Sequence, residues 1–547
     1  MPVITFDKKY LYSMLGADMN DDKLSDQVSK LGFEIETVGA DDIALEITPN
    51  RLDLLDGVGF SRTVKNFMHK SKKYVYRLQD DVPKFSILVE PSVKKVRPFI
   101  SGLVAQGLTL SGSDLVNLIN FSEKFCETYG RGRRKIAIGM HNFDKLKTPL
   151  VYRSGSDEDF VALGNEASMK YSKILESTEK GKQYSQILKS DKVCYYPELI
   201  DSEGPIAFIP ILNSERTKIT TATKNIFVDI TGTSEYAVNK TADLLTATFM
   251  DMGAEVKKVR INYGKTQMDT PELAERYVVV PLTRIEREIG AVIGFNNVIS
   301  LANKMGYEAA LVGNNIRFRV PEYRLDIIGE QDVIEDVAIA YGYEYIRPAP
   351  IFYSQRGGLE GSTLFNRKAA EVAIGLGFTE FSNSYLTNEE VNFNKMGLHR
   401  DDGAVALKNA KTEAISMMRT WLLPSLLGNL SLSTKEKLPQ NVFELDLVFA
   451  VKDSSVNEAY HIAGVSIDTK ANFNDMKAAV EGFLKALGIE HAVTELNHKS
   501  FIPGRCAEIK AGSKRIGMFG ELHPLVLKNF GIEEPGTAFE MDLSTLE

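Results

Sequence analysis

Residues Arg324–Tyr345 read RLDIIGEQDVIEDVAIAYGYEY, and this stretch decides how the middle of the chain folds. Asp332, Glu335 and Asp336 are spaced i, i+3 and i+4, so a helix places them on one face. Apolar residues mostly cover the opposite side, which supports the helix. Asp326 lies earlier, where a strand-like run gives way to the helix.

Carboxylate oxygens that converge near a helix start suit a hard cation such as Mg²⁺. We therefore expect Asp326, Asp332, Glu335 and Asp336 to contribute oxygens to one Mg²⁺ site. The alternative is a solvated acidic helix face with Asp332 as its N-cap, because acidic first turns are common. Spacing alone leaves both interpretations open.

The bulk properties indicate a soluble, multidomain protein. A chain of 547 residues is too long for one core, so three to five domains are expected. The sequence has no apolar run long enough for a transmembrane helix and no signal peptide at its start. Cys126, Cys194 and Cys506 are scattered, which fits a reducing cytoplasm. A net charge of −8 argues against a dominant electrostatic grip on nucleic acid.

The chain contains an internal repeat. KLGFE at Lys30–Glu34 corresponds to KMGYE at Lys304–Glu308, and each copy continues to a proline followed by an arginine and an aspartate. Each copy predicts strand, helix, helix, strand, then a further helix, so we expect two related α+β modules at 1–85 and 272–348. The first copy keeps Arg51 and Asp53 but lacks the acidic helix face, so only the second could hold a metal this way.

Two further domains complete an α+β, multidomain organisation. Residues 86–268 predict a mixed, β-rich domain that contains a polar, loosely structured insertion at Ser154–Ser190. Gly264–Glu272 reads as a polar linker. Residues 355–547 predict a mostly antiparallel sheet flanked by helices.

Several motifs resemble one family, in that family's order. The 324–345 stretch resembles the B5 domain of the β subunit of phenylalanyl-tRNA synthetase, where the resemblance implies that the four carboxylates bind Mg²⁺ near the catalytic α subunit. EITPNRLDLLDGVGFSR at Glu46–Arg62 resembles the B1 module. Residues Pro205–Thr233 and IGMHNFD at Ile138–Asp144 resemble the B3/B4 module, which hydrolyses mischarged tRNA.

The last part of the chain resembles the B6/B7 catalytic-like domain. RTWLLPSLLGN (Arg419–Asn429), VFELDLVF (Val442–Phe449) and the IPGRCAEI and IGMFGELHP runs within Ile502–Pro524 carry this resemblance. An early OB-fold insertion and a C-terminal anticodon-binding domain do not fit the sequence, so the archaeal form is implied. Class II synthetases offset the charge of the ATP triphosphate with arginines, and VFELDLVF has none. We therefore expect a class II fold without its catalytic arginines.

The resemblance implies a β subunit of phenylalanine-tRNA ligase in an α2β2 heterotetramer with the α subunit and tRNA(Phe), which supports phenylalanine charging by α and hydrolyses mischarged Tyr-tRNA(Phe). Tyrosine differs from phenylalanine by one hydroxyl, and an apolar amino-acid pocket rejects an added hydroxyl only about 10²-fold. A second site that hydrolyses the tyrosyl ester would raise this selectivity. Polar groups that could build it are Asn213, Glu215, Thr221, Asp229, Thr231 and His141. These residues could equally be turn and cap residues of a β-rich domain.

Two other functions are compatible with parts of the sequence. A stand-alone tRNA-binding or trans-editing module would need neither the carboxylate cluster nor the catalytic-like domain. A metal-dependent hydrolase centred on Asp326 is disfavoured, since no base that could activate a nucleophile is evident nearby.

Overall fold

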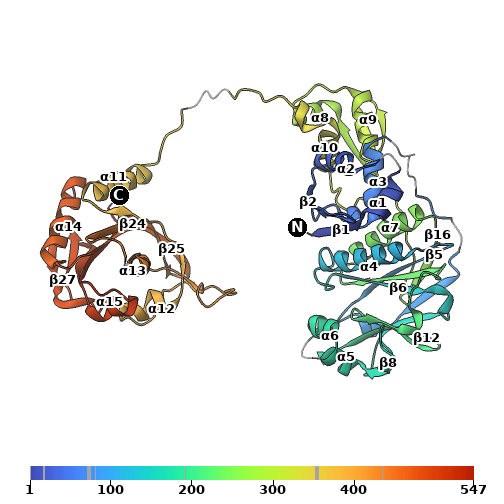
Figure 1. Ribbon diagram of the computed structural model, residues 1–547, viewed down its shortest axis with the longest axis horizontal. Coiled ribbons are helices and arrows are strands. Elements are labelled where there is room, and N and C mark those ends of the chain that lie inside the picture. The colour runs from blue at the N-terminus through green and yellow to red at the C-terminus, as the bar shows by residue number, and fades with distance from the viewer. Residues whose placement is uncertain are drawn as a thin grey trace. The chain divides into compact units, whose positions relative to one another are not determined.

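The computed structural model describes residues 2–16, 19–69, 76–79, 82–190, 193–351, 356–433 and 435–546. The chain forms two compact units, Met1–Pro350 and Ile351–Glu547, and each is described by itself (Figure 1). The boundary expected at 355 lies outside the described residues.

The first repeat is a three-stranded antiparallel sheet, ordered β1-β3-β2, with helices packed on it. Its elements are β1 (Val3–Asp7), α1 (Lys8–Leu15), α2 (Asp21–Lys30), β2 (Glu34–Val38), β3 (Asp42–Glu46), the 3₁₀ helix η1 (Leu52–Leu54) and α3 (Gly57–Phe67). Two strands follow the helix pair where one was expected, because the chain turns back as the hairpin β2–β3.

The second repeat has the same order of elements. They are β18 (Arg276–Pro281), α8 (Leu282–Ile289), α9 (Phe295–Lys304), β19 (Glu308–Val312), β20 (Asn315–Val320) and α10 (Glu330–Tyr341), and the sheet order is β18-β20-β19. The N-cap of α10 is Gly329 and not Asp332. Asp332 instead lies at the third helical position and accepts backbone N–H groups from the turn before the helix.

The chain between the two repeats forms a ten-stranded sheet, along which the order is β14-β13-β12-β7-β4-β16-β5-β15-β6, with β17 paired to β16. The strands are β4 (Phe85–Val89), β5 (Phe99–Gln106), β6 (Ile136–Asn142), β7 (Leu150–Gly155), β12 (Tyr196–Asp201), β13 (Gly204–Phe208), β14 (Leu212–Asn213), β15 (Ile226–Gly232), β16 (Glu255–Asn262) and β17 (Gln267–Thr270). The linker expected at Gly264–Glu272 therefore contains a paired strand.

The helices α4 (Gly112–Glu127) and α7 (Glu235–Asp251) pack on this sheet (Figure 1). In β15 the even-numbered and odd-numbered side chains point to opposite faces of the sheet. Ile226, Val228 and Ile230 join the core that contains both helices, while Phe227, Asp229 and Thr231 face the other side. This second face carries polar groups in a buried position.

The polar insertion at Ser154–Ser190 is more ordered than its composition suggests. It forms β8 (Asp159–Phe160), β9 (Met169–Lys170), α5 (Tyr171–Ser177), α6 (Glu179–Tyr184), η4 (Ser185–Leu188) and β10 (Lys189–Ser190), which pairs with β11 (Val193–Cys194). Sparse apolar side chains such as Phe160, Tyr171 and Ile174 gather with Phe208 in a small core of their own. The expectation of a loosely structured insertion was wrong, because a few buried apolar side chains are enough to hold this segment in a fixed fold.

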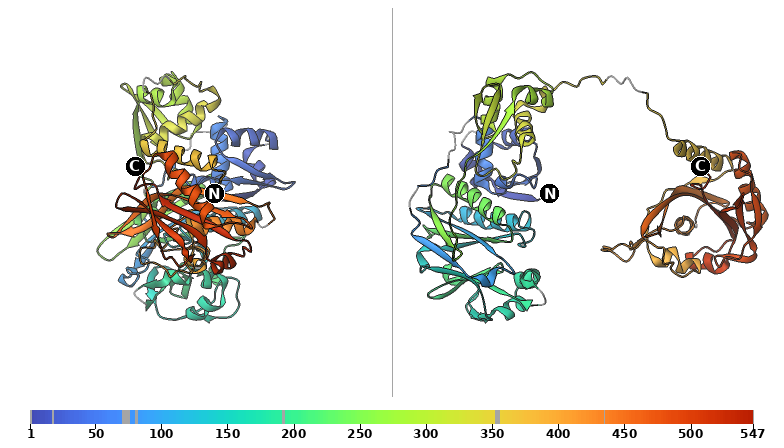
Figure 2. Two further views of the ribbon diagram at one scale, coloured as in Figure 1. Left: turned by 90° about the vertical axis from the view of Figure 1, so that its left-hand side faces the viewer. Right: turned by 180° about the vertical axis from the view of Figure 1, so that it is seen from behind.

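The second unit is a seven-stranded sheet ordered β21-β24-β25-β29-β28-β27-β26, and only the β21–β24 pair is parallel. The strands are β21 (Thr379–Glu380), β24 (Gln440–Lys452), β25 (Ser455–Ile467), β26 (Ala492–Glu495), β27 (Phe501–Ala511), β28 (Lys514–Leu522) and β29 (Gly536–Asp542). The helices α11 (Gly361–Gly375) and α14 (Phe473–Leu487) share one core, and α13 (Leu423–Leu432) and α15 (Pro524–Phe530) share the other. Figure 2 shows the sheet curving around α13.

The remaining short elements lie in connections. They are η2 (Pro91–Val93), η3 (Phe143–Lys145), η5 (Glu215–Thr217), η6 (Tyr343–Tyr345), β22 (Leu386–Thr387), α12 (Glu389–Asn392), η7 (Asn394–Met396) and β23 (Met417–Met418). In the described part of the chain, no helix is both long and apolar enough to cross a bilayer.

Candidate functional site

A cavity of about 280 Å³ lies along β6 and β15, closed by the 208–214 segment and bordered by α4. Asp229 lies opposite Gly139, and Thr231 lies opposite Ala137, so small residues flank both polar ones on the same face. A Cβ on Gly139 would overlap the Asp229 carboxylate. The absence of a side chain there leaves room for this carboxylate at the cavity wall.

Asp229 is held from behind by His141, a side chain with no solvent exposure. His141 Nε2 lies 3.0 Å from Asp229 Oδ2, and Nδ1 lies 2.8 Å from Thr217 Oγ1. With the Asp229 carboxylate oxygen as acceptor, Nε2 carries the hydrogen and donates to it. The sequence analysis named both residues as candidate polar groups of one site, and the structure places their side chains in contact. His141 itself lies behind the cavity wall and orients Asp229.

Thr231 is bonded to an arginine that the sequence analysis did not single out. Arg97 precedes β5 and is 1% exposed. Its Nε donates to Thr231 Oγ1 at 2.9 Å, and its Nη2 donates to the Thr231 carbonyl at 2.7 Å. Its Nη1 donates to the Arg133 carbonyl at 2.8 Å. Burial lowers the pKa of Arg97 from its ordinary value.

Asn213 also lines the cavity, where its amide nitrogen donates to the Met140 carbonyl at 3.3 Å. Glu215 and Thr221 are not among the lining residues. Glu215 accepts the Gly164 N–H at 2.7 Å and pairs with Lys218, and Thr221 is exposed. The structure thus brings Asn213, Asp229 and Thr231 to one cavity. Glu215 lies outside it in the 3₁₀ helix η5, and Thr221 lies outside it in a turn.

Charged side chains line the mouth of the cavity and contact the insertion. Arg133 donates through Nη1 to the carbonyls of Pro210 and Ile211, at 2.8 and 3.0 Å. Its guanidinium lies 4.6 Å from the ring centre of Tyr184 in the insertion. Glu123 of α4 pairs with Lys180 of α6. These contacts hold the insertion against the pocket.

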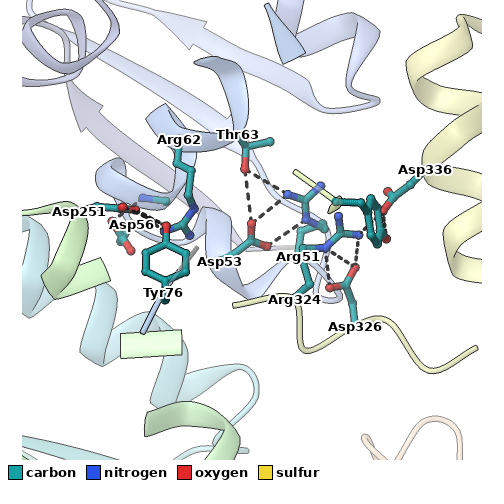
Figure 3. A network of polar contacts seen from close by, with 12 residues as sticks. Arg51, Asp53, Asp56, Arg62, Thr63, Tyr76, Asp251, Arg324, Asp326 and Asp336 are labelled. Atoms are coloured by element: carbon teal, nitrogen blue, oxygen red, sulfur yellow. Dashed lines mark hydrogen bonds and ion pairs between the residues drawn. The ribbon is translucent and has the colours of Figure 1, made fainter. Parts of the chain in front are cut away.

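The carboxylates expected to bind Mg²⁺ take part in other contacts (Figure 3). Arg324 is 2% exposed and donates to both oxygens of Asp326, through Nε at 2.9 Å and Nη2 at 2.8 Å. The same Nη2 lies 2.7 Å from Asp336 Oδ2, and the Tyr307 hydroxyl also donates to Asp336. Burial raises the pKa of Asp336. One arginine therefore pairs with two of the four carboxylates.

The other two carboxylates do not converge on them. Asp332 accepts the backbone N–H groups of Ile328 and Gly329, at 2.6 and 2.8 Å, and Glu335 is exposed. Within the described ranges, no group of three or more His, Cys, Asp or Glu side chains is arranged to hold a metal ion. The expected four-carboxylate Mg²⁺ site does not fit this arrangement, because Arg324 occupies the position where a cation would lie.

The first repeat carries the matching pair. Arg51 donates to Asp53 through Nε at 3.0 Å and Nη2 at 2.9 Å, and Figure 3 shows this pair beside Arg324. Arg62 of α3 lies over the Tyr323 ring, 3.8 Å from its centre, and pairs with Asp251 of α7. The arginine–aspartate pairs of the two repeats thus lie beside each other, and Arg62 contacts the second repeat through Tyr323.

In the second unit, Arg419 is fully buried and donates to Glu444 at 2.6 Å and to the Leu447 carbonyl at 2.9 Å. The VFELDLVF segment therefore contributes acids to an internal ion pair. His523 accepts the Leu525 N–H as the N-cap of α15. Both groups have structural partners.

Three family models match successive parts of the chain. The B3/4 domain matches residues 99–249, which contain the cavity. The tRNA synthetase B5 domain matches residues 278–343. The phenylalanyl tRNA synthetase beta chain CLM domain matches residues 348–543. The order of domains is the one that the motifs predicted.

Relatives match along nearly the whole length. The phenylalanine–tRNA ligase beta subunit of Methanocaldococcus jannaschii is 33% identical over 560 residues, which cover 99% of this chain and 100% of the relative. That of Archaeoglobus fulgidus is 34% identical over 551 residues, covering 100% and 98%. The crystal structure of an N-terminal fragment of the Pyrococcus horikoshii phenylalanyl-tRNA synthetase beta subunit is 31% identical, has a TM-score of 0.60, and covers 62% of this chain and 100% of the fragment. The chain therefore belongs to the family of archaeal phenylalanine–tRNA ligase beta subunits.

Proposed function

We propose that the chain assembles with a phenylalanine–tRNA ligase alpha subunit, as an α2β2 heterotetramer in the cytoplasm, and supports the charging of tRNA(Phe). The family membership supports this role. The buried pairing of Arg419 with Glu444 supports the view that the second unit contributes contacts and not adenylate chemistry. The isolated chain should then show no phenylalanine-dependent exchange between ATP and pyrophosphate, and exchange well above background contradicts this division of labour.

The chemistry assigned to this chain is hydrolysis of tRNA(Phe) that carries tyrosine, in the cavity along β6 and β15. The observation that carries the proposal is the carboxylate of Asp229, which is oriented by His141 and lines a largely apolar cavity of about 280 Å³. A cavity of this size accommodates an aromatic side chain and the reacting ester. Asp229 can accept a hydrogen bond from the attacking water and orient it.

Recognition of the tyrosyl side chain, and so discrimination against phenylalanine, is assigned to Asn213. An amide both donates and accepts, so its side chain can bind a phenol hydroxyl, whereas phenylalanine leaves that polar group without a partner. Each buried group left unpaired costs about 1–3 kcal/mol, which corresponds to a preference of roughly ten- to a hundredfold. Asn213 is half-buried in the cavity wall, as this role requires.

The experiment compares deacylation of Tyr-tRNA(Phe) and Phe-tRNA(Phe) by the complete complex. Asn213→Ala should reduce the preference for the tyrosyl substrate by about tenfold or more while the chain stays folded. Thr221→Ala is the matched control, because Thr221 is exposed and outside the cavity. An Asn213→Ala complex that keeps the full preference shows that Asn213 has only a structural role in β14.

A further inference from the structure

Arg97 differs from the other fully buried arginines in its partners. Arg324 and Arg419 each pair with carboxylates. For Arg97, the described residues provide no salt-bridge partner, and its donors are directed to the Thr231 hydroxyl and to main-chain carbonyls. A buried cation without a carboxylate partner is costly, and such a group is retained for a structural or electrostatic role.

The contact with Arg97 determines how the Thr231 hydroxyl can act. Because Oγ1 accepts from Arg97 Nε at 2.9 Å, the hydroxyl hydrogen must point elsewhere. No described residue accepts it. Thr231 lies in the wall of the cavity, two residues along β15 from Asp229 and on the same face, so the two side chains are roughly 7 Å apart.

We propose that Arg97 is a positioning residue for ester hydrolysis, which directs the Thr231 hydroxyl as a hydrogen-bond donor to the carbonyl oxygen of an aminoacyl ester. This inference rests on the proposed editing function. It adds the Thr231 hydroxyl as the group that stabilises the oxyanion, whereas Asp229 orients the attacking water.

The two neighbouring groups fit the two halves of the reaction. The oxygen of a water that Asp229 holds attacks the ester carbonyl carbon, and the carbonyl electron pair moves onto oxygen. The Thr231 hydroxyl, polarised by the Arg97 cation behind it, donates to this oxyanion. Collapse of the intermediate breaks the bond to the ribose oxygen, which takes a proton that the water gave up. The products are the free amino acid and tRNA with its ribose hydroxyl restored.

The test uses single-turnover and steady-state deacylation of Tyr-tRNA(Phe) by the complete complex. Arg97→Met should lower kcat about 10²- to 10³-fold with little change in KM, since an oxyanion donor acts on the transition state. Arg97→Lys should recover part of the loss by keeping the charge. The control Arg260→Met removes a partly exposed ion pair with Asp269 in the same domain and should leave the rate unchanged.

A second pair of variants keeps the test decisive if Arg97→Met does not fold. Thr231→Val should lose as much activity as Arg97→Met, and Thr231→Ser should keep most of it. In complexes that fold, the double variant should be no slower than either single one, because Arg97 acts through Thr231. Additive losses, or full activity of Thr231→Val, overturn the proposal. If the wild-type complex hydrolyses no Tyr-tRNA(Phe), the editing function fails instead.

Discussion

Gly139→Ala is the substitution that tests the geometry of the cavity most economically. A Cβ at Gly139 would lie 3.0 Å from Asp229 Cγ and 3.2 Å from His141 Nε2, and would overlap Asp229 Oδ2. Asp229 is 2% exposed, so its carboxylate cannot move into solvent without leaving His141. The single methyl group therefore displaces the carboxylate from the position in which it would hold the water.

The expected loss follows from that displacement. A positioned acid–base group contributes about 10²- to 10⁴-fold to a rate, so kcat for deacylation of Tyr-tRNA(Phe) should fall by at least about 10²-fold. Overpacking in a tight site also costs about 1–3 kcal/mol of stability, which this chain should tolerate. Phenylalanine charging by the complex should be unchanged, since the substitution lies in the cavity and not in the alpha subunit.

Gly112→Ala provides the matched control in the same domain. Gly112 begins α4 and has no neighbour within 4 Å of an added Cβ. Both variants would be assayed by release of labelled tyrosine from tRNA(Phe), beside a thermal unfolding scan. A Gly139→Ala complex that deacylates within about threefold of wild type refutes the assignment of Asp229.

Three further predictions concern stability. Arg324→Met should lower the free energy of unfolding of the first unit in urea by about 3–5 kcal/mol, because Asp326 and Asp336 stay buried and lose their arginine partner. The control Arg287→Met, at an exposed site, should change it little. Equal urea midpoints for the two variants refute this prediction. Removal of divalent ions with EDTA should leave the thermal midpoint unchanged, and a fall of more than about 2–4 °C would show that a cation stabilises the fold after all. Burial raises the pKa of Asp56, so its protonated form stabilises the fold below the unfolded-state pKa of about 3.9 and that contribution is lost as pH rises through the folded-state pKa. Asp56→Asn keeps the acceptor at the N-cap of α3 and should flatten this decline in unfolding free energy, and an unchanged slope contradicts the assignment.

Periodicity predicted the long elements well. The sequence pattern predicts helices at 113–128, 235–252 and 474–487 and a strand at 441–451. The observed α4, α7, α14 and β24 differ from these bounds by at most one residue at either end, because each buries a regular apolar face. The polar hairpin strands and β17 were missed. β19, for example, is mostly exposed and carries no clear alternation. The insertion lacked a clear pattern in the sequence because part of its core, Phe208, comes from the strand β13 outside it.

The candidate site was predicted in part. Asp229 and Thr231 alternate on one strand, so their shared face could be expected, and His141 lies on the neighbouring strand. Arg97 could not be found, since it is 134 residues from Thr231 and belongs to no motif. The Mg²⁺ site was predicted from carboxylate spacing alone, and that prediction took no account of Arg324. Its planar guanidinium binds Asp326 through two nitrogens, so these carboxylates have an internal cationic partner.

The most direct test of the central claim is the rate at which the purified complex releases tyrosine from preformed Tyr-tRNA(Phe), compared with phenylalanine from Phe-tRNA(Phe). We expect the tyrosyl ester to be hydrolysed at least about tenfold faster, without ATP. Asp229→Ala should abolish this hydrolysis while charging continues. Equal rates for the two esters, or full tyrosine release by the Asp229→Ala complex, would contradict the assignment of editing to this cavity.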